Sequence, residues 1–273
     1  EEMLKEVEEK SKKLALGLNV KGLLNIQFAI KDEELFILEA NPRASRTMPF
    51  VAKVTGNQII KAGTLLMLGY SIDEVRNKTK YLSSSSNKVA IKKAIFPWSR
   101  FPAEDTMLGP EMKATGEVLG VGKEFGTALN KAYAAAGVEI NNKEKGIFVT
   151  LSDSEKPNFI KTVNKYLELG FKLYSTEGTG KFLKTNGIDS VIVGKADDLG
   201  QTSLTIIEDK LVSLVINTPT YANELSDGWK IRRLSHETGV AVVSSVREAD
   251  AFIEAFLNQN LVLDDLEVIQ DVS

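Results

Sequence analysis

A short stretch near the N-terminus combines oxygen-bearing and guanidinium side chains at a spacing that suits metal–phosphate chemistry. Gln27 lies in an apolar run, Glu39 and Asn41 end the next run, and Arg43 and Arg46 follow. Residues two apart in a strand share a face, and Gln27 lies opposite Glu39 if the loop between the runs has an odd number of residues. Carboxylate and amide oxygens are ligands for hard divalent cations, and arginine stabilises phosphoryl charge. Solvated edge residues remain the alternative for so short a motif.

A second group of polar residues recurs in the C-terminal half, where strand-like and helix-like segments alternate from Gly146 onward. That alternation predicts a parallel sheet covered on both faces, and ligands bind beyond the carboxyl ends of such strands. Helix N-termini at this edge favour phosphate. The residues at or beside the five strand ends are Thr150, Lys156, Thr176, Thr179, Lys195, Asn217 and Ser244. Any one hydroxyl or amide can simply cap a helix. The recurrence at five ends, with two lysines, favours a pocket for a small phosphorylated ligand.

The elements that must position these residues follow from hydrophobic periodicity. In the C-terminal half we expect strands at 147–151, 171–175, 190–193, 211–217 and 240–244, and helices at 155–169, 179–186, 202–209, 229–238 and 247–258. Before them we expect a helix at 1–16, a hairpin of 23–30 with 35–40, helices at 57–69 and 124–136, and a strand at 88–96. Residues 97–126 are expected to be mostly loop. The chain opens inside a helical pattern without Met, which suggests a fragment of a longer polypeptide.

Composition excludes several classes of protein. The 273 residues carry a net charge of −3, so no basic excess points to nucleic acid. There is no cysteine and a single histidine, His236, which excludes disulfides and a histidine-rich zinc site. No apolar run reaches the ~20 residues that span a bilayer. We therefore expect a soluble cytoplasmic protein with no membrane or nucleic-acid partner.

The N-terminal half resembles the carbamoyl phosphate synthetase family. The stretches VKGLLNIQFAI and LFILEANPRASRTMPFVAKVTG are similar to the end of that family's second ATP-grasp domain, and FPWSRF and LGPEMKATGEVLGVG also look like it. The resemblance implies an α/β protein: a partial ATP-grasp α+β domain at residues 1–138, then a Rossmann-like domain with a five-stranded parallel sheet at 139–273. That second domain resembles the methylglyoxal-synthase-like allosteric domain of the same family.

The resemblance also implies an activity, that of an ATP-dependent ligase of pyrimidine and arginine biosynthesis. Gln27, Glu39 and Asn41 would hold the Mg²⁺ or Mn²⁺ ions that bridge the ATP phosphates. Arg43 and Arg46 would contact phosphate or the carbamate that is phosphorylated to carbamoyl phosphate. The implied partners are a glutamine amidotransferase small subunit and the rest of the large subunit. Because the lid and the adenine-holding segments of the ATP-grasp fold are not in this chain, the fragment is expected to be inactive alone.

In the allosteric domain the resemblance implies a pocket for nucleotide effectors: UMP, IMP or phosphoribosyl pyrophosphate. The seven strand-end residues named above would line it. Two departures from the family pattern affect these expectations. Pro219 stands where the family often has a hydroxyl, and Lys93 stands where ornithine-activated members have Glu. A non-catalytic effector-binding module and a methylglyoxal synthase are the alternatives; the synthase needs a catalytic histidine, and His236 is expected on a polar surface.

Overall fold

The computed structural model describes residues 1–79, 88–98, 106–107, 112–138, 140, 146–219 and 226–258. It divides into two compact units, one of residues 1–87 with 263–273 and one of residues 88–262. No helix among the described residues has the length and apolar character needed to cross a membrane.

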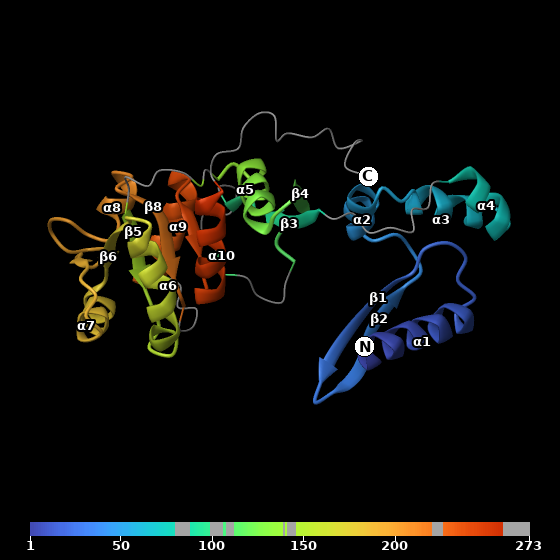
Figure 1. Ribbon diagram of the computed structural model, residues 1–273, viewed down its shortest axis with the longest axis horizontal. Coiled ribbons are helices and arrows are strands. Elements are labelled where there is room, and N and C mark those ends of the chain that lie inside the picture. Colours follow the sequence, from blue (N-terminus) through green and yellow to red (C-terminus); the bar gives the residue numbers. More distant parts are fainter. Residues whose placement is uncertain are drawn as a thin grey trace. The chain divides into compact units, whose positions relative to one another are not determined.

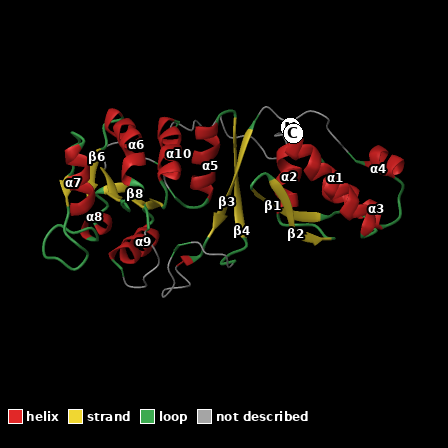
Figure 2. Cartoon of the chain, turned by 90° about the horizontal axis from the view of Figure 1, so that it is seen from below, coloured by secondary structure: helices red, strands yellow, loops and turns green. Residues whose placement is uncertain are grey.

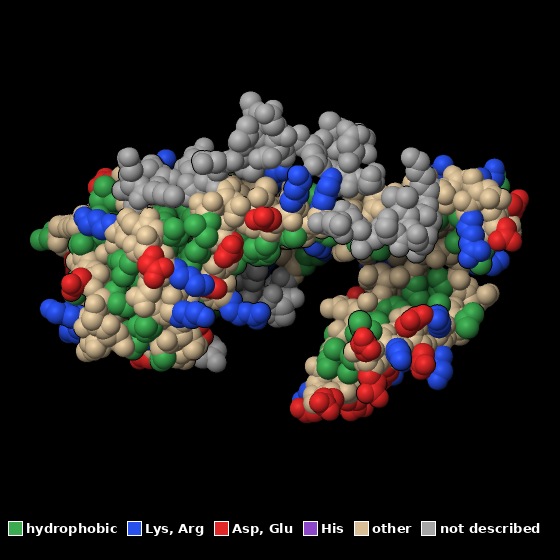
Figure 3. All heavy atoms as spheres, viewed as in Figure 1, with side chains coloured by type: hydrophobic (Ala, Val, Ile, Leu, Met, Phe, Trp, Pro, Cys, Tyr) green, Lys and Arg blue, Asp and Glu red, His purple; other side chains and the backbone are tan. Residues whose placement is uncertain are grey.

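The N-terminal unit consists of one long helix, a hairpin and three short helices (Figure 1). Their bounds are α1 Glu2–Gly17, β1 Asn25–Lys31, β2 Glu34–Asn41, α2 Thr47–Thr55, α3 Ile59–Met67 and α4 Ile72–Lys78. Among its described residues only Leu35, Gly63 and Val75 are buried. Acidic side chains gather at the tip of the hairpin, where Asp32, Glu33 and Glu34 are exposed (Figure 3).

The C-terminal unit begins with a ribbon and a helix that the sequence only partly predicts. Strand β3 (Val89–Ile95) pairs antiparallel with β4 (Gly116–Gly122), and α5 (Phe125–Ala135) follows. Strand β4 lies in the segment that was expected to be mostly loop, so that expectation was wrong for these residues. Strand propensity did not predict β4, because the segment is rich in Gly and Gly is depleted in strands. Two of these glycines are needed for packing, because a Cβ on Gly120 or on Gly122 would overlap the main chain of α5 at Ala128.

The rest of the C-terminal unit is a five-stranded parallel sheet with the order β7-β6-β5-β8-β9. Its strands are β5 Gly146–Thr150, β6 Lys172–Ser175, β7 Val191–Ile192, β8 Val212–Asn217 and β9 Ala241–Val243. The helices between and after them are α6 Lys156–Glu168, α7 Glu177–Thr185, α8 Thr205–Glu208, α9 Asp227–Thr238 and α10 Val246–Leu257. The expected five-stranded α/β sheet is thereby confirmed.

Strand alternation sorts the core onto the two faces of this sheet. On β5, the buried Ile147 and Val149 belong to one apolar cluster with side chains of α5, α6 and α10. Phe148, between them, belongs to a second cluster with α8 and α9. Figure 2 shows α6 and α10 on one side of the strands and α8 and α9 on the other. Because both faces are covered, the strands read as continuous apolar runs ending in polar residues.

The packing of α5 explains why the compact units divide elsewhere than at the expected boundary of residues 138 and 139. Leu129 and Tyr133 of α5 lie in the same buried cluster as Phe252 of α10, and the rings of Tyr133 and Phe252 meet edge to face at 4.6 Å. Gly126 allows this approach, because a Cβ there would overlap the carbonyl oxygen of Glu254. The β3–β4 ribbon and α5 therefore pack with the parallel sheet. The division at 138/139 stays a prediction about sequence relationship.

Candidate functional site

The hairpin brings Gln27 opposite Glu39 by a route different from the one expected. The connecting loop is the two-residue pair Asp32 and Glu33, an even number, and both residues have positive φ, 50° and 64°, as a type I′ turn requires. If regular pairing continued from that turn, Gln27 would lie opposite the residue before Glu39. A β-bulge restores it, because Gln27 pairs with Glu39 while Phe28 pairs with Ile37. A bulge inserts one extra residue and re-aims the side chains beyond it.

The resulting hairpin end offers a set of hard oxygen donors. Gln27 and Glu39 are exposed, and Asn41, opposite Asn25, is half-buried. No group of three or more His, Cys, Asp or Glu residues that would hold a metal exists among the described residues. One carboxylate with two amide oxygens still fits a magnesium-type cation, which keeps several waters and shares its sphere with phosphate oxygens. The donor chemistry therefore fits a cation shared with a nucleotide.

The two arginines lie just beyond this end of the hairpin. Arg43 and Arg46 are both exposed and sit between β2 and α2. Arg43 donates from Nη1 to the carbonyl oxygen of Ala44 at 3.2 Å. Arg46 occupies the N-cap position of α2 without a side-chain cap. An exposed guanidinium after a donor-bearing strand can contact a phosphate oxygen in bidentate fashion.

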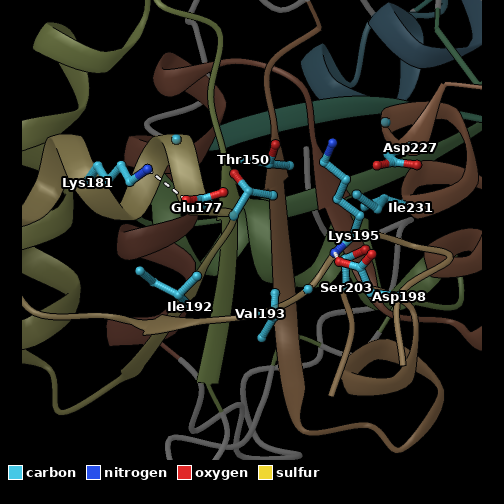
Figure 4. A pocket seen from close by; sticks show the side chains of 14 residues that line it. Thr150, Glu177, Lys181, Ile192, Val193, Lys195, Asp198, Ser203, Asp227 and Ile231 are labelled. Atoms are coloured by element: carbon cyan, nitrogen blue, oxygen red, sulfur yellow. Dashed lines mark hydrogen bonds and ion pairs between the residues drawn. The ribbon is translucent and has the colours of Figure 1, made fainter. Parts of the chain in front are cut away.

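The second site is a cavity of about 590 Å³ in the C-terminal unit. It opens at the carboxyl ends of β5, β6 and β7 and reaches the first residues of α9 (Figure 4). Its described lining consists of Thr150, Thr176, Glu177, Gly178, Lys181, Ile192, Val193, Gly194, Lys195, Asp198, Ser203, Asp227, Gly228 and Ile231. Thr150, Thr176 and Lys195 of the predicted set are therefore brought together.

The N-terminus of α7 supplies backbone donors to this cavity. Thr176, its N-cap residue, makes no side-chain cap to the helix, and its hydroxyl donates instead to Oγ1 of Thr179 at 3.2 Å. The early N–H groups of the helix are thus left without a side-chain cap beside the cavity, where the helix dipole favours an anion. Gly178 keeps the approach open, since a Cβ there would lie 3.9 Å from Nζ of Lys156.

The side chain of Lys156 lies next to Gly178. Its side chain is 15% exposed, and its ammonium pairs with Asp153 at 2.5 Å. Asp153 itself is 95% exposed. The ammonium lowers the pKa of Asp153, first through the hydrogen bond and then through its charge. Because the carboxylate is in water, this ion pair contributes little to stability.

Four predicted residues, Lys156 among them, lie outside the described cavity lining, and the other three also have partners elsewhere. Thr179 is buried, and its hydroxyl accepts from the backbone N–H of Leu151 at 3.1 Å, tying α7 to the end of β5. Asn217 is buried and accepts from Arg232 at 2.8 Å. Ser244 is exposed at the end of β9, and its backbone N–H donates to Glu248. The expected convergence of all five strand ends is therefore not found, because neither β8 nor β9 contributes a residue to the described cavity lining.

Two arginines of α9 are buried although charged residues are rarely buried. Arg232 and Arg233 are 4% and 6% exposed. Arg233 pairs with Glu237 at 2.7 Å. A buried Arg is held by partners, as Arg232 is by Asn217.

His236 lies outside the cavity lining and is exposed, as expected. Its ring is 6.0 Å from that of the buried Trp98. Desolvation of the ring, together with the charges of Lys93, Arg233 and Arg232, lowers the pKa of His236 to about 4. Among the described residues, the cavity thus has no histidine to act as an acid or base.

Comparison with known proteins finds family models that match both parts of the chain. A family model for the carbamoyl-phosphate synthase L chain, ATP binding domain, matches residues 1–75, and one for the MGS-like domain matches residues 158–244. The "Carbamoyl phosphate synthase large chain, C-terminal section" of Aquifex aeolicus is 38% identical over 268 residues, covering 93% of this chain and 50% of that protein. The section of the same name from Methanocaldococcus jannaschii is 38% identical over 251 residues, covering 89% of this chain and 40% of that protein.

A longer relative gives the same picture. The "Carbamoyl phosphate synthase large chain" of Brucella suis is 40% identical over 262 residues, covering 93% of this chain but 22% of that protein. The chain thus spans at most half the length of these three relatives. Over about nine-tenths of its own length, this chain is similar to carbamoyl phosphate synthase large chains and to their C-terminal sections, with a match to the ATP-binding domain model followed by a match to the MGS-like domain model.

Proposed function

We propose that this chain works as the C-terminal part of a carbamoyl phosphate synthase large chain, an ATP-dependent ligase, and that its own role is to bind nucleotide effectors. The observation that carries the proposal is the cavity at the ends of β5, β6 and β7. It gathers Thr150, Thr176 and Lys195 around the N-terminus of α7. Hydroxyl groups, a lysine ammonium and uncapped N–H groups recognise phosphate, and the volume accommodates a nucleotide.

The N-terminal unit would contribute to the ATP site. Gln27, Glu39 and Asn41 would hold a divalent cation, Mg²⁺ or Mn²⁺, and Arg43 and Arg46 would contact phosphoryl oxygens. When bound, the cation neutralises phosphate charge during transfer from ATP to carbamate. The chain's own residues orient the phosphates and stabilise their charge. The bulge that sets Gln27 against Glu39 supports this role, since bulges often lie next to active sites.

The apolar surface of the N-terminal unit supports contact with further polypeptide. A groove of about 490 Å³ is lined by Lys10, Lys13, Leu14, Gly17, Leu18 and Ile37. Phe36 and Leu38 of β2 are 42% and 60% exposed. A two-stranded hairpin needs further packing on its apolar face to be stable in water. We propose that the rest of the large chain covers this face, and that a glutamine amidotransferase subunit completes the enzyme.

Calorimetric titration tests the effector site. UMP, IMP and phosphoribosyl pyrophosphate are added in turn to the whole chain, and at least one is expected to bind. Lys195→Ala should weaken that binding roughly 10- to 100-fold, the worth of a hydrogen bond to a charged group. Lys184→Ala is the matched control, because Lys184 is exposed at the other end of α7. An unchanged affinity in Lys195→Ala would remove that residue from the site.

Failure of all three nucleotides to bind would refute the effector role. Turnover of dihydroxyacetone phosphate by the same preparation would instead favour a methylglyoxal synthase. We expect none, because the described cavity lining includes no histidine. We also expect the chain alone to make no ATP from carbamoyl phosphate and ADP.

A further inference from the structure

Ser203 carries a buried hydroxyl without a partner. The residue is 1% exposed, and its Oγ has no hydrogen-bond partner among the described residues. Leaving a buried hydroxyl unsatisfied costs free energy, so such a group calls for an explanation. Other buried or half-buried serines in this unit are satisfied: Ser235 donates to the carbonyl oxygen of Ile231 at 2.7 Å, and Ser175 shares a 2.7 Å hydrogen bond with Ser190.

The backbone around Ser203 is tightly fixed. Its own N–H donates to the carbonyl oxygen of Gly194 at 3.0 Å. Thr202 and Thr205 on either side are linked reciprocally, with N–H to hydroxyl distances of 2.9 Å and 3.2 Å. The residue cannot easily turn its main chain to find a partner. The hydroxyl of Ser203 is therefore held in position, although none of the described residues forms a hydrogen bond with it.

Ser203 is also one of the residues that line the effector cavity. Figure 4 shows Glu177 and Lys181 on one side of that cavity, and Ser203 with Asp227 and Ile231 on the other. The two sides differ in chemistry. The first includes the N-terminus of α7, which favours an anion. The second also includes Lys195 and Asp198, so it combines two carboxylates and one ammonium with an apolar side chain and a neutral hydroxyl. Such a mixed polar and apolar wall suits a neutral heterocycle.

We infer that Ser203 is a specificity-determining residue whose hydroxyl hydrogen-bonds a polar edge of the ligand's heterocyclic base. This inference rests on the proposed effector site and adds a role to it. The phosphate lies at the N-terminus of α7, and the base extends towards α9 and meets Ser203 beside Ile231. A uracil-like or hypoxanthine-like ring offers both carbonyl and N–H groups at its edge, and either satisfies a hydroxyl.

Replacing Ser203 with Ala should leave the stability of the free protein unchanged or higher and should weaken nucleotide binding. In the free protein, Ser203→Ala removes an unsatisfied group, so its melting temperature should equal or exceed that of the unaltered chain. Binding of UMP and IMP should weaken roughly five- to tenfold, because one neutral hydrogen bond is lost. Binding of ribose 5-phosphate, which has no base, should change by less than roughly twofold.

Ser235→Ala is the matched control. Its hydroxyl is equally buried but is bonded to Ile231, and Ser235 is not among the described cavity residues. It should lower the melting temperature and leave the ratio of nucleotide to ribose 5-phosphate affinity unchanged. A merely structural role for Ser203 would make both variants behave alike.

The experiment is calorimetric titration of the three probes into the unaltered chain and both variants, with thermal melts of each. Unaltered nucleotide affinity in Ser203→Ala, or equal weakening for ribose 5-phosphate, would overturn the inference while leaving the effector site intact. A lowered melting temperature in free Ser203→Ala, matching that of Ser235→Ala, would also overturn it. Absence of any nucleotide binding to the unaltered chain would overturn the proposed function, and this inference with it.

Discussion

The buried pair of Asn217 and Arg232 should be one of the main local determinants of stability in the C-terminal unit. Both residues are 4% exposed, and the amide oxygen of Asn217 accepts a hydrogen bond from Nη1 of Arg232 at 2.8 Å. Gly228 sits directly above them, where an added Cβ would lie 3.2 Å from that same nitrogen. The pair therefore forms part of the support beneath the cavity. Asn217→Ala removes the oxygen and leaves the guanidinium with one partner fewer.

The magnitude follows from the charge. A hydrogen bond to a charged group contributes about 1.5–3 kcal/mol, and loss of a buried partner also strands part of the charge. For a unit of residues 88–262, about 1 kcal/mol shifts the melting temperature by roughly 2–4 °C, so a fall of roughly 3–12 °C is expected. Thermal unfolding followed by tryptophan fluorescence is the assay. Trp98 and Trp229, the two tryptophans of the chain, both lie in this unit.

Asn186→Ala is the control for this measurement. Asn186 is exposed at the end of α7, and its side chain donates to the carbonyl oxygen of Phe182 at 2.9 Å. Its loss should cost at most about 0.5 kcal/mol, as is usual for surface changes. If Asn217→Ala lost no more than Asn186→Ala, the reasoning that a buried charge depends on this amide would be refuted.

Three further outcomes are expected. Gly126→Ala should lower the free energy of unfolding by about 1–3 kcal/mol in a urea titration, because the new Cβ would overlap the main chain of α10; Gly116→Ala, whose nearest neighbours lie at 3.7 Å, should be close to neutral. Tyr133→Phe should cost about 1.5–3 kcal/mol, since the phenol donates to Glu248 at 3.0 Å; an unchanged midpoint would contradict that bond. His236 has a pKa of about 4 in the folded chain against an ordinary 6.5, so the unfolded chain binds its proton first and stability falls as the pH drops from 6.5 towards 4. His236→Gln should flatten that decline, and an equal slope in the variant would show that His236 does not cause it.

Much of the fold of the C-terminal unit could be predicted from periodicity alone. Its strands are apolar runs of few residues that end in polar ones, and its helices have a single apolar face, as in α6 with Phe159, Val163 and Tyr166 buried. Strand β4 could not be found in this way. Gly120 and Gly122 allow close contact with α5, and that contact exists only in the folded chain.

The candidate sites were predictable to a smaller extent. Thr150, Thr176 and Lys195 could be placed because strand ends in a parallel sheet meet at one edge. The strand order, which places Ser244 at the end of the edge strand β9, cannot be predicted from local sequence. Ser203 and Asp227 were missed because they do not lie at strand ends: Ser203 lies just before α8, and Asp227 is the first residue of α9. The bulge that aligns Gln27 with Glu39 was also beyond reach, since no single residue marks it.

Hydrogen–deuterium exchange of the whole chain, with and without a saturating nucleotide, tests the central claim most directly. Binding at the cavity should slow exchange in three segments, 150–156, 176–181 and 193–203, because a ligand that binds only the folded site suppresses its local opening. The hairpin of residues 25–41 should be unaffected by UMP or IMP. Protection that appears at the hairpin and not at these three segments would contradict the claim that the cavity of the C-terminal unit is the effector site.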